Sequence, residues 1–398
     1  MNVFNGFAAN FSIKQTFRHL FACGNNNHSA GLIAALKTHY SADKVALYSN
    51  GRSALAAAIR ASVPAGSKIA INGLTCYAVI QAVRAADCEP VYIDISPVDL
   101  NLSASRLDQV LRKTTGVKAV IVQNMLGFTT NIKSLEKIAK NYNLTIIEDL
   151  AHCAGARYTD GREVGTVGAA AALSFGKGKA IDTVSGGALV VNQNNWSAGQ
   201  IAENFEADFL NPTHRQKTSI NLRARFYPFF GLLVRILFPL KLGKPLAALL
   251  FKIKFTQRSA DGHVDLKTKL PNWQAKLALA QLKDLNQIAK SRNKNAKRII
   301  KSLDLTHLSA INFNAPLRVP VLVKNRETLL KTLDKSGFHL DDIWYDVPVS
   351  PKRYYKKTNF PEKDCPETVK IAQNIINLPT FYPPEKLKNA INIIKESL

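Results

Sequence analysis

Short apolar runs alternate with helical segments between about residues 44 and 192, and this alternation constrains the fold more than any other feature. The apolar runs lie at 45–48, 68–71, 90–93, 119–122, 145–147 and 188–191. Segments between them, such as 53–62 and 132–142, repeat apolar residues at three- and four-residue spacing, which is typical of helices. Strands that are apolar on both faces and separated by helices predict an α/β fold with a mostly parallel, covered sheet. Ligands of such sheets bind at the carboxyl ends of the strands.

The remainder of the chain predicts a second, smaller unit. Residues 273–303 have the pattern of one long amphipathic helix. After it, a strand pattern at 318–323 mixes with helix patterns at 327–336 and 385–397, as in a compact α+β domain. We therefore predict a large domain over residues 1–260, with an N-terminal arm, and a domain over 261–398 that begins with the long helix.

Charge and cysteine content limit the possible partners. The formal net charge of +24 favours anionic partners such as a phosphorylated substrate or lipid headgroups. Because the lysines are dispersed and no RNA- or DNA-binding motif accompanies them, we expect no nucleic-acid partner. The five cysteines are scattered without a C-x-x-C pair, so we expect neither a disulfide framework nor a metal site. Since the first residues lack a signal-peptide pattern, we expect a cytoplasmic protein.

An apolar insertion at residues 226–255 interrupts the α/β pattern of the large domain. Arg235 and several prolines leave no stretch of about 18–20 apolar residues, so a membrane-spanning helix is not expected. Two short apolar helices edged with lysines are expected here, and such helices can lie in a membrane interface. They can equally pack in a dimer interface or cover the active site, and the sequence leaves these alternatives open.

Charged residues follow two of the predicted strands at a characteristic spacing. Residues 146–152, Ile-Ile-Glu-Asp-Leu-Ala-His, place Asp149 at the end of a buried strand, and residues 174–179, Ser-Phe-Gly-Lys-Gly-Lys, follow a second apolar run. Pyridoxal phosphate (PLP) needs a carboxylate that keeps its pyridine nitrogen protonated and a lysine that holds it as a Schiff base. The spacing thus predicts a PLP-dependent aminotransferase, with Lys179 or Lys177 as the lysine.

Residues 48–55, Tyr-Ser-Asn-Gly-Arg-Ser-Ala-Leu, predict a strand end, a turn at Gly51 and the start of a helix. The first backbone amides of a helix and its dipole favour an anion, so this segment is a candidate cradle for the cofactor phosphate. Taken alone, a glycine before a helix is usually only a turn. In the same way, Asp149 alone could cap a helix, and His152 either contacts the cofactor or packs in the core.

Together these motifs resemble the DegT/StrS sugar-aminotransferase family, PLP enzymes of the aspartate-aminotransferase fold (fold type I). The resemblance extends from residue 49 to residue 383 through segments 49–55, 90–95, 147–156, 164–168, 174–179, 186–187, 281–282 and 377–383. It implies homodimers with active sites at the subunit boundary. It also implies a site composed of Gly51, Arg52, Ser53, Asp149, His152, Ser174 and Lys179.

The resemblance implies a role for each position. Lys179 matches the Schiff-base lysine because it stands five places after Ser174, the phosphate-contacting serine, and Lys177 is the runner-up. Asp149 matches the partner of the pyridinium, and His152 matches the position beside the ring oxygen. Arg52 and Ser53 match positions of the phosphate cradle.

Four features depart from the family pattern. Segment 75–77, Thr-Cys-Tyr, lacks the usual aromatic residue that stacks on the cofactor, so Cys76 or Tyr77 must fill that role. The segment after Lys179 is one residue short and has Ser185 in place of a glutamate, and Ser350 stands where a histidine is expected. The insertion at 226–255 is longer and more apolar than in soluble sugar aminotransferases. These departures leave the cofactor assignment standing but place the sugar substrate in doubt.

The expected function is transfer of an amino group from an amino-acid donor, glutamate, to a keto group of a nucleotide-linked sugar. A PLP-dependent sugar dehydratase is one alternative, but in dehydratases of this fold a histidine replaces the lysine, so Lys179 disfavours it. A non-catalytic or regulatory PLP-fold protein at the membrane surface is the second alternative.

Overall fold

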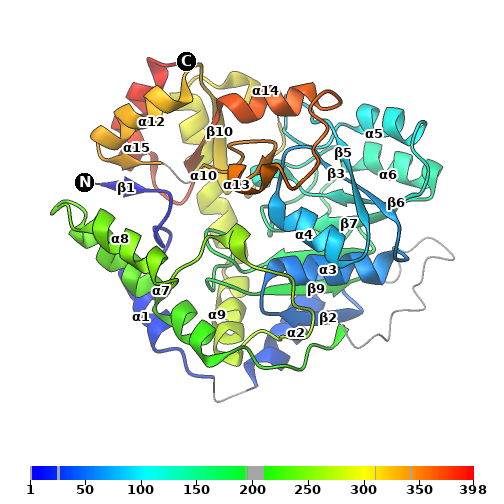
Figure 1. Cartoon of the computed structure of the whole chain (residues 1–398), viewed down its shortest axis with the longest axis horizontal. Helices are drawn as coiled ribbons and strands as arrows, with labels where there is room; N and C mark the ends of the chain where they lie inside the picture. Colours follow the sequence, from blue (N-terminus) through cyan, green and yellow to red (C-terminus); the bar gives the residue numbers. More distant parts are fainter. Residues whose placement is uncertain (1, 25–26, 193–194, 196–209, 310, 341–342) are drawn as a thin grey trace.

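The computed structural model describes residues 2–24, 27–192, 195, 210–309, 311–340 and 343–398. A seven-stranded sheet of order β2-β9-β8-β7-β6-β3-β5 forms its centre (Figure 1). Every strand is parallel to its neighbours except β9, which is antiparallel to both β2 and β8. The strands are β2 (Lys44–Tyr48), β3 (Lys68–Asn72), β5 (Glu89–Ile93), β6 (Val117–Val122), β7 (Thr145–Asp149), β8 (Ala170–Ser174) and β9 (Gly187–Val191). The predicted α/β fold with a mostly parallel sheet is confirmed.

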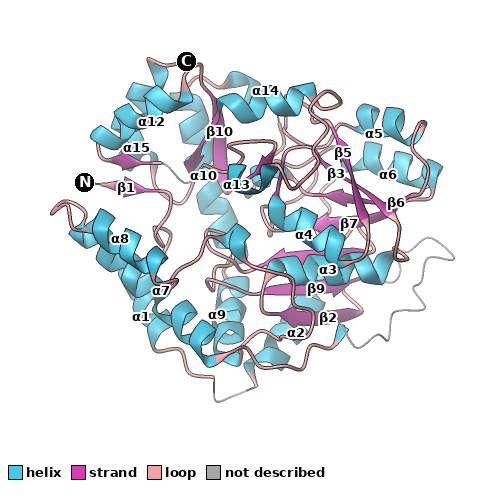
Figure 2. Ribbon diagram, viewed as in Figure 1, coloured by secondary structure: helices cyan, strands magenta, loops and turns pink. Residues whose placement is uncertain are grey.

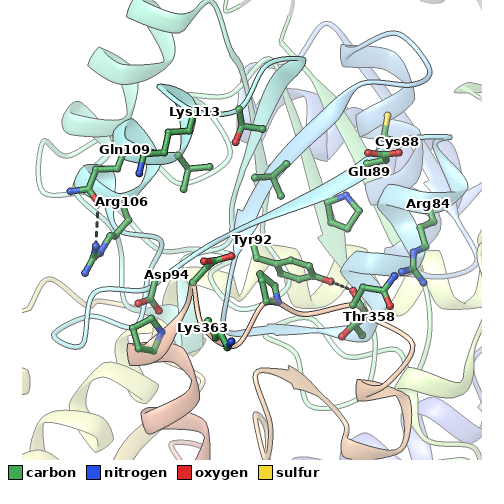
Figure 3. Close-up of a pocket in the computed structure, with 18 residues that line it drawn as sticks. Arg84, Cys88, Glu89, Tyr92, Asp94, Arg106, Gln109, Lys113, Thr358 and Lys363 are labelled. Carbon is green, nitrogen blue, oxygen red and sulfur yellow. Dashed lines mark hydrogen bonds between the residues drawn. The ribbon is translucent and has the colours of Figure 1, made fainter.

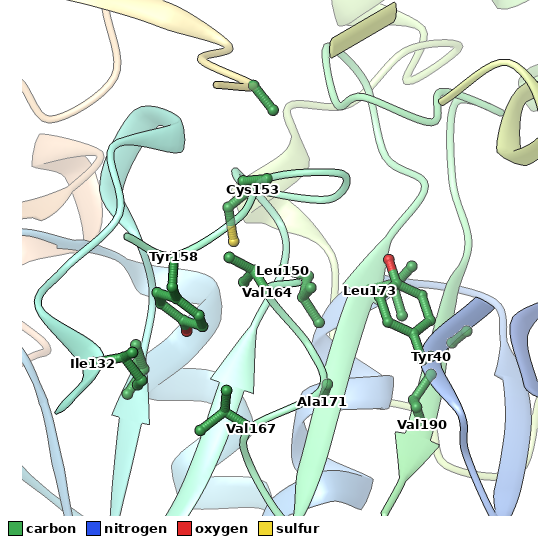
Figure 4. Packing of buried hydrophobic residues seen from close by; sticks show 14 of the residues in the cluster. Tyr40, Ile132, Leu150, Cys153, Tyr158, Val164, Val167, Ala171, Leu173 and Val190 are labelled. Carbon is green, nitrogen blue, oxygen red and sulfur yellow. The ribbon is translucent and has the colours of Figure 1, made fainter. Parts of the chain in front are cut away.

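Helices cover both faces of the sheet. On one face lie α2 (His28–Tyr40), α5 (Ala104–Leu111), α6 (Ile132–Tyr142) and α9 (Asn272–Lys283), and on the other lie α3 (Gly51–Ser62) and α4 (Tyr77–Ala85). Alternate residues of β8 serve the two cores, because Ala171 and Leu173 belong to one apolar cluster and Ala170 and Ala172 to the other. Figure 4 shows Tyr40 packed in the first of these clusters.

The C-terminal part builds a separate apolar core above the sheet (Figure 2). Its two-stranded antiparallel sheet is formed by β10 (Arg318–Leu322) and β13 (Ile375–Pro379). Its helices are α10 (Leu285–Ser302), α11 (Thr306–Ser309), α12 (Arg326–Lys335), α13 (Lys352–Tyr355), α14 (Pro366–Asn374) and α15 (Pro384–Lys395). Two short parallel pairs connect it to the rest: β1 (Val3–Phe4) with β11 (Phe338–His339), and β4 (Thr75–Cys76) with β12 (Val349–Ser350).

The predicted single helix over 273–303 is wrong in one respect. Asp284, with φ −91° and ψ 0°, separates α9 from α10, so two helices follow one another. The helix α9 packs on the sheet, and α10 begins in the same apolar cluster with Leu285 and Ala289. Its second half, from Ala296 onward, packs in the C-terminal core. The amphipathic pattern continues through the break, and this is why the sequence did not reveal it. The domain division at residue 260 stays a prediction.

The apolar insertion also differs from the two short helices expected. It forms α7 (Thr218–Leu237), a twenty-residue helix that continues through Pro228, and the shorter α8 (Gly243–Lys252). The N-terminal arm, with α1 (Ile13–Leu20), packs against α7, and a Cβ atom at Gly231 would lie 2.6 Å from the carbonyl oxygen of Phe7. In the described part of the chain, no helix is long and apolar enough to cross a membrane.

Candidate active site

A cavity of about 1040 Å³ lies where β7 and β8 end and α3 begins. Seven predicted site residues line it: Gly51, Arg52, Cys76, Asp149, His152, Ser174 and Lys179. These residues come from four separate parts of the chain, which the carboxyl ends of the strands bring together. The structure does not bring Ser53 and Tyr77 to the wall of this cavity.

The start of α3 is fixed closely against the end of β8. A Cβ atom at Gly51 would lie 2.7 Å from Oγ of Ser174, so only glycine fits at this position. Asn50 caps the helix, because its Oδ1 accepts a hydrogen bond from the Ser53 N–H at 2.9 Å. The first amides of a helix have no acceptor within the helix, so a phosphate placed beside Gly51 and Ser174 would meet hydrogen-bond donors.

Ser53 and Arg52 connect α3 to the segment after α8. Ser53 is fully buried, and its hydroxyl donates to Asn50 and accepts from the N–H of Asp265, each at 2.9 Å. The guanidinium of Arg52 donates to the carbonyl oxygens of Ser259 and Gly262, and burial lowers the pKa of Arg52. In this conformation Arg52 and Ser53 attach the backbone of residues 259–265 to the start of α3, at the rim of the cavity.

Asp149 ends β7 with its carboxylate toward the cavity. Its Oδ1 accepts from the N–H of Ala151 at 3.0 Å. Burial raises the pKa of Asp149, while the charge of Lys179 and a hydrogen bond from Gln123 lower it. A buried carboxylate on a cavity wall is stabilised by a cation inside that cavity, and a protonated pyridine nitrogen is such a cation. The buried Asp149 carboxylate therefore fits the pyridine nitrogen of PLP.

His152 presents a neutral ring to the same cavity. The backbone N–H of Leu126 donates to its Nδ1 at 3.2 Å, so Nδ1 carries no proton. Burial, together with the positive charges of Lys179 and Arg318, lowers the pKa of His152 well below 6.5. Its ring stacks on Trp344, with centroids 4.9 Å apart and planes inclined by 14°.

The two candidate lysines differ in their surroundings. Nζ of Lys177 donates to Oγ1 of Thr256 at 3.1 Å and to the carbonyl oxygen of Gln257 at 2.8 Å, so Lys177 is held against the segment after α8. Nζ of Lys179 instead lies 4.6 Å from the ring centroid of Trp344, and its charge affects the pKa of both Asp149 and His152. This placement favours Lys179 as the lysine that meets the cofactor.

The loop that carries Lys179 is held by Asp182, which the sequence did not single out. The buried carboxylate accepts from the N–H groups of Gly178 and Val184 and from Nδ2 of Asn10, at 2.7–2.8 Å. The side-chain amide of Gln281 accepts from the N–H of Asp182 and donates to its carbonyl oxygen. An acid between the candidate lysine and the glycine pair is the signal that could have revealed this role.

Asp182→Asn should change how stability depends on pH. Burial raises the pKa of Asp182 from 3.8 to about 6 in the folded protein, despite three hydrogen bonds that oppose the shift. A carboxyl with a raised folded pKa stabilises the fold fully below its unfolded pKa, and this stabilisation is lost as the pH rises through about 6. Between about pH 5 and 7, the wild type should lose roughly 1 kcal/mol of unfolding free energy relative to the variant. Urea unfolding of both proteins at several pH values measures this, and a pH-independent difference would contradict it.

The C-terminal part contributes residues that sequence analysis missed. Arg318 lies 3.8 Å from the ring centroid of Trp344, and the hydroxyl of Tyr345 lies 3.3 Å from Nδ1 of His152. No motif pointed to Trp344 or Arg318, because their neighbours lie far away in sequence. Of the two candidates for the missing stacking aromatic, Cys76 lines the cavity, whereas Tyr77 stacks on Tyr354 with ring centroids 4.5 Å apart.

A second cavity, of about 870 Å³, lies beside the edge strand β5 (Figure 3). Its wall mixes basic and acidic side chains, and the Tyr92 hydroxyl donates to the carbonyl oxygen of Thr358 at 2.8 Å. It contains none of the predicted site residues. We therefore place the candidate active site in the first cavity.

Known proteins resemble the chain in sequence and in fold. The sequence model of the DegT/DnrJ/EryC1/StrS aminotransferase family matches residues 21–216 and 251–395 and thus leaves out most of α7 and α8. The GDP-perosamine synthase of Escherichia coli O157:H7 is 31% identical over 145 residues, 36% of this chain and 39% of that protein. A pleiotropic regulatory protein of Geobacillus stearothermophilus is 29% identical over 147 residues, 37% of this chain and 39% of that protein. The chain therefore matches well under half of the length of these curated relatives.

Solved structures match over nearly the whole chain. The putative sugar aminotransferase Spr1654 from Streptococcus pneumoniae, in its PMP-form, has a TM-score of 0.69 and covers 97% of both chains at 17% identity. At this identity the likeness shows the fold alone, which is that of fold type I PLP aminotransferases.

Proposed function

The chain belongs to the DegT/DnrJ/EryC1/StrS aminotransferase family, whose members are fold type I PLP enzymes, and we propose that it is itself an active aminotransferase. The donor that we propose is an amino acid, glutamate, and the acceptor is a keto group of a nucleotide-linked sugar. One observation carries the proposal: Asp149, His152, Lys179 and the start of α3 line a single cavity.

We assign the cofactor contacts as follows. Asp149 would pair with the pyridine nitrogen, His152 would contact the ring, and Gly51, Arg52 and Ser174 would hold the phosphate. Cys76 occupies the place of the usual aromatic residue. When bound, PLP supplies an electron sink for the carbon from which the amino group leaves. Ser53 and Tyr77 lie outside the cavity wall and position neighbouring segments, Ser53 by its bond to Asp265 and Tyr77 by stacking on Tyr354.

Lys179 has two tasks in this proposal. Its Nζ would hold the cofactor as a Schiff base and, once the amine of the donor has displaced it, would act as general base towards the α-carbon proton of the donor and then as general acid. Lys179 lies close enough to Asp149 and His152 for its positive charge to lower the pKa of both, which supports its place beside the cofactor. The retained lysine also disfavours the dehydratase alternative.

The basic cavity wall supports an acceptor that carries a diphosphate. Residues before, within and after the insertion line the cavity with five cationic side chains: Arg215, Lys217, Arg223, Lys254 and Arg258. Fixed positive charges on a cavity wall attract phosphoryl groups and hold them by charge-assisted hydrogen bonds. A nucleotide-linked sugar presents such groups next to its sugar ring.

We also propose a cytoplasmic homodimer that contacts a membrane through residues 226–255. The resemblance to the family supports the homodimer, and the apolar insertion supports the membrane contact. A regulatory protein without catalysis is the remaining alternative, and one relative is named a pleiotropic regulatory protein. The complete set of lysine, acid and histidine in one cavity favours the enzyme.

A substrate screen tests the proposed function. We expect the purified protein with PLP and glutamate to convert at least one nucleotide-linked keto-sugar to an amino-sugar, which mass spectrometry detects as replacement of the keto oxygen by a hydrogen and an amino group. The Lys179→Ala variant is the matched control and should form none. A protein that binds PLP but converts no sugar with any amino-acid donor would favour the regulatory alternative.

A further inference from the structure

Exposed apolar side chains gather in two segments of the chain. Of the fifteen large apolar side chains that are exposed among the described residues, eleven lie within residues 13–21 and 222–253. They are Ile13, Phe17, Phe21, Leu222, Phe229, Ile236, Leu240, Leu242, Leu249, Phe251 and Ile253, and we call them the α1–α7–α8 surface. Single exposed apolar residues are ordinary, but a concentration of this kind marks an interaction site.

The helix α1 has its polar and apolar faces reversed. It buries Thr16 and His19, and burial lowers the pKa of His19 to about 4, so that its ring is neutral. Ile13, Phe17 and Phe21, spaced four residues apart on another face, are 63%, 49% and 69% exposed. A helix that only supported the fold would turn these aromatic and aliphatic side chains inward.

The helices α7 and α8 bury Val234 and Leu250 but leave most of their other large apolar side chains partly or largely exposed. The helix α7 buries Ala224 and Gly231, whereas Leu222, Phe229 and Ile236, spaced seven residues apart, form a stripe on its outer face. Between about 38% and 60% of each of these three side chains is exposed. The helix α8 buries Gly243, Ala247 and Leu250 and exposes Leu249 and Phe251.

The three helices form one layer. Arg225 of α7 donates to the carbonyl oxygen of Leu20 in α1, and Phe230 of α7 packs edge-on against Phe255, which follows α8. Figure 1 shows α1, α7 and α8 together at the lower left of the molecule. The family sequence model leaves out residues 217–250, which contain α7 and most of α8.

The segments that form the layer carry charges of a single sign. No aspartate or glutamate occurs in residues 1–42 or 209–260. Five basic side chains of these segments are exposed beside the apolar ones: Lys14, Arg18, Lys241, Lys244 and Lys252. Lys244 pairs with Asp334 of the C-terminal part. The layer therefore combines exposed apolar side chains with an excess of positive charge.

We propose that the α1–α7–α8 surface docks on an anionic lipid bilayer, with its apolar side chains in the interface and its basic side chains at the headgroups. This extends the membrane contact proposed above to α1, and it does not depend on the transamination reaction. Amphipathic helices with basic edges bind such interfaces through apolar burial together with attraction to anionic lipid. A second copy packed layer against layer fits this surface less well, because the segments that form both layers carry lysines and no aspartate or glutamate.

Docking in this orientation places the bilayer close to the active site. The inner side of α7 lines the cavity through Arg223, Ala224 and Tyr227, while its outer side carries the exposed stripe. One helix thus separates the proposed membrane surface from the proposed substrate site.

Vesicle flotation tests the docking surface. We expect the wild-type protein to float with vesicles of phosphatidylcholine mixed with phosphatidylglycerol, not with phosphatidylcholine alone, and to be released by high salt. The pairs Phe17→Ser with Phe21→Ser, and Phe229→Ser with Ile236→Ser, should each weaken binding about tenfold or more. The pair Lys241→Glu with Lys252→Glu should remove the dependence on anionic lipid.

Matched controls separate the surface from general effects. Val98→Ser with Leu322→Ser removes exposed apolar side chains elsewhere, and Lys137→Glu with Lys140→Glu reverses the same charge on α6; both pairs should bind vesicles as the wild type does. Thermal unfolding and the absorbance of bound PLP, which should be unchanged in all variants, report an intact fold. Failure to float, or equal flotation of surface and control variants, would overturn the proposal. So would sedimentation showing that the surface variants dissociate a dimer without lipid.

Discussion

Replacing Lys179 by alanine should abolish covalent attachment of PLP and reduce transamination by about 10²–10⁴-fold or more. The expected loss is large because one amine both anchors the cofactor and moves the proton. The fold should survive, since Asp182 and Gln281 hold the loop without help from this side chain. Borohydride reduction followed by peptide mapping measures attachment directly, independently of any sugar substrate.

Lys177→Ala is the matched control for this prediction. It removes a lysine from the same loop and with it the hydrogen bonds to Thr256 and Gln257, but the cofactor should remain attached. A pyridoxyl group found on Lys177 after reduction would show that the assignment is wrong. Retained absorbance of attached cofactor in Lys179→Ala would show the same.

The position of the site could be predicted because it depends on strand ends. In a parallel sheet the carboxyl ends of neighbouring strands meet at one edge, so Asp149 and Ser174 had to lie close together once both were placed after strands. Gly51 reached the same place because α3 follows β2 on the same edge, and the close approach of Ser174 explains why a glycine stands there.

The sequence assigned the site acid to Asp149, and the structure shows what its neighbour Glu148 does at the end of β7. Glu148 and Asp149 are adjacent, but successive strand residues point to opposite faces. Glu148 is fully buried and accepts hydrogen bonds from the N–H groups of Gly165, Val167 and Gly168 and from the Tyr158 hydroxyl. Its acceptor capacity is used within the fold, so Asp149 is the acid that faces the cavity.

Contacts between distant parts of the chain could not be predicted. The stacking of Trp344 on His152 joins residues almost two hundred positions apart, and no local pattern marks either as a partner. The Ser53 side chain is buried because its hydroxyl forms hydrogen bonds with Asn50 and with the N–H of Asp265. Only the folded chain brings Asp265 near Ser53. The role of α1 was missed for a related reason: an eight-residue helix with apolar residues four positions apart indicates a buried face, and the structure exposes that face.

Replacing Asp149 by asparagine should lower the transamination rate about 10²-fold or more while leaving the fold intact. Asparagine keeps the shape and can still accept from the Ala151 N–H, but it removes the negative charge opposite the pyridine nitrogen. Without that charge the ring nitrogen loses its proton more easily, and the electron sink weakens. The effect should therefore appear in kcat more than in cofactor content, which absorbance measures separately.

Asp87→Asn, which removes the same charge from an exposed pair with Arg60, is the matched control and should keep the wild-type rate. An Asp149→Asn enzyme within about threefold of the wild-type rate would exclude this role for Asp149.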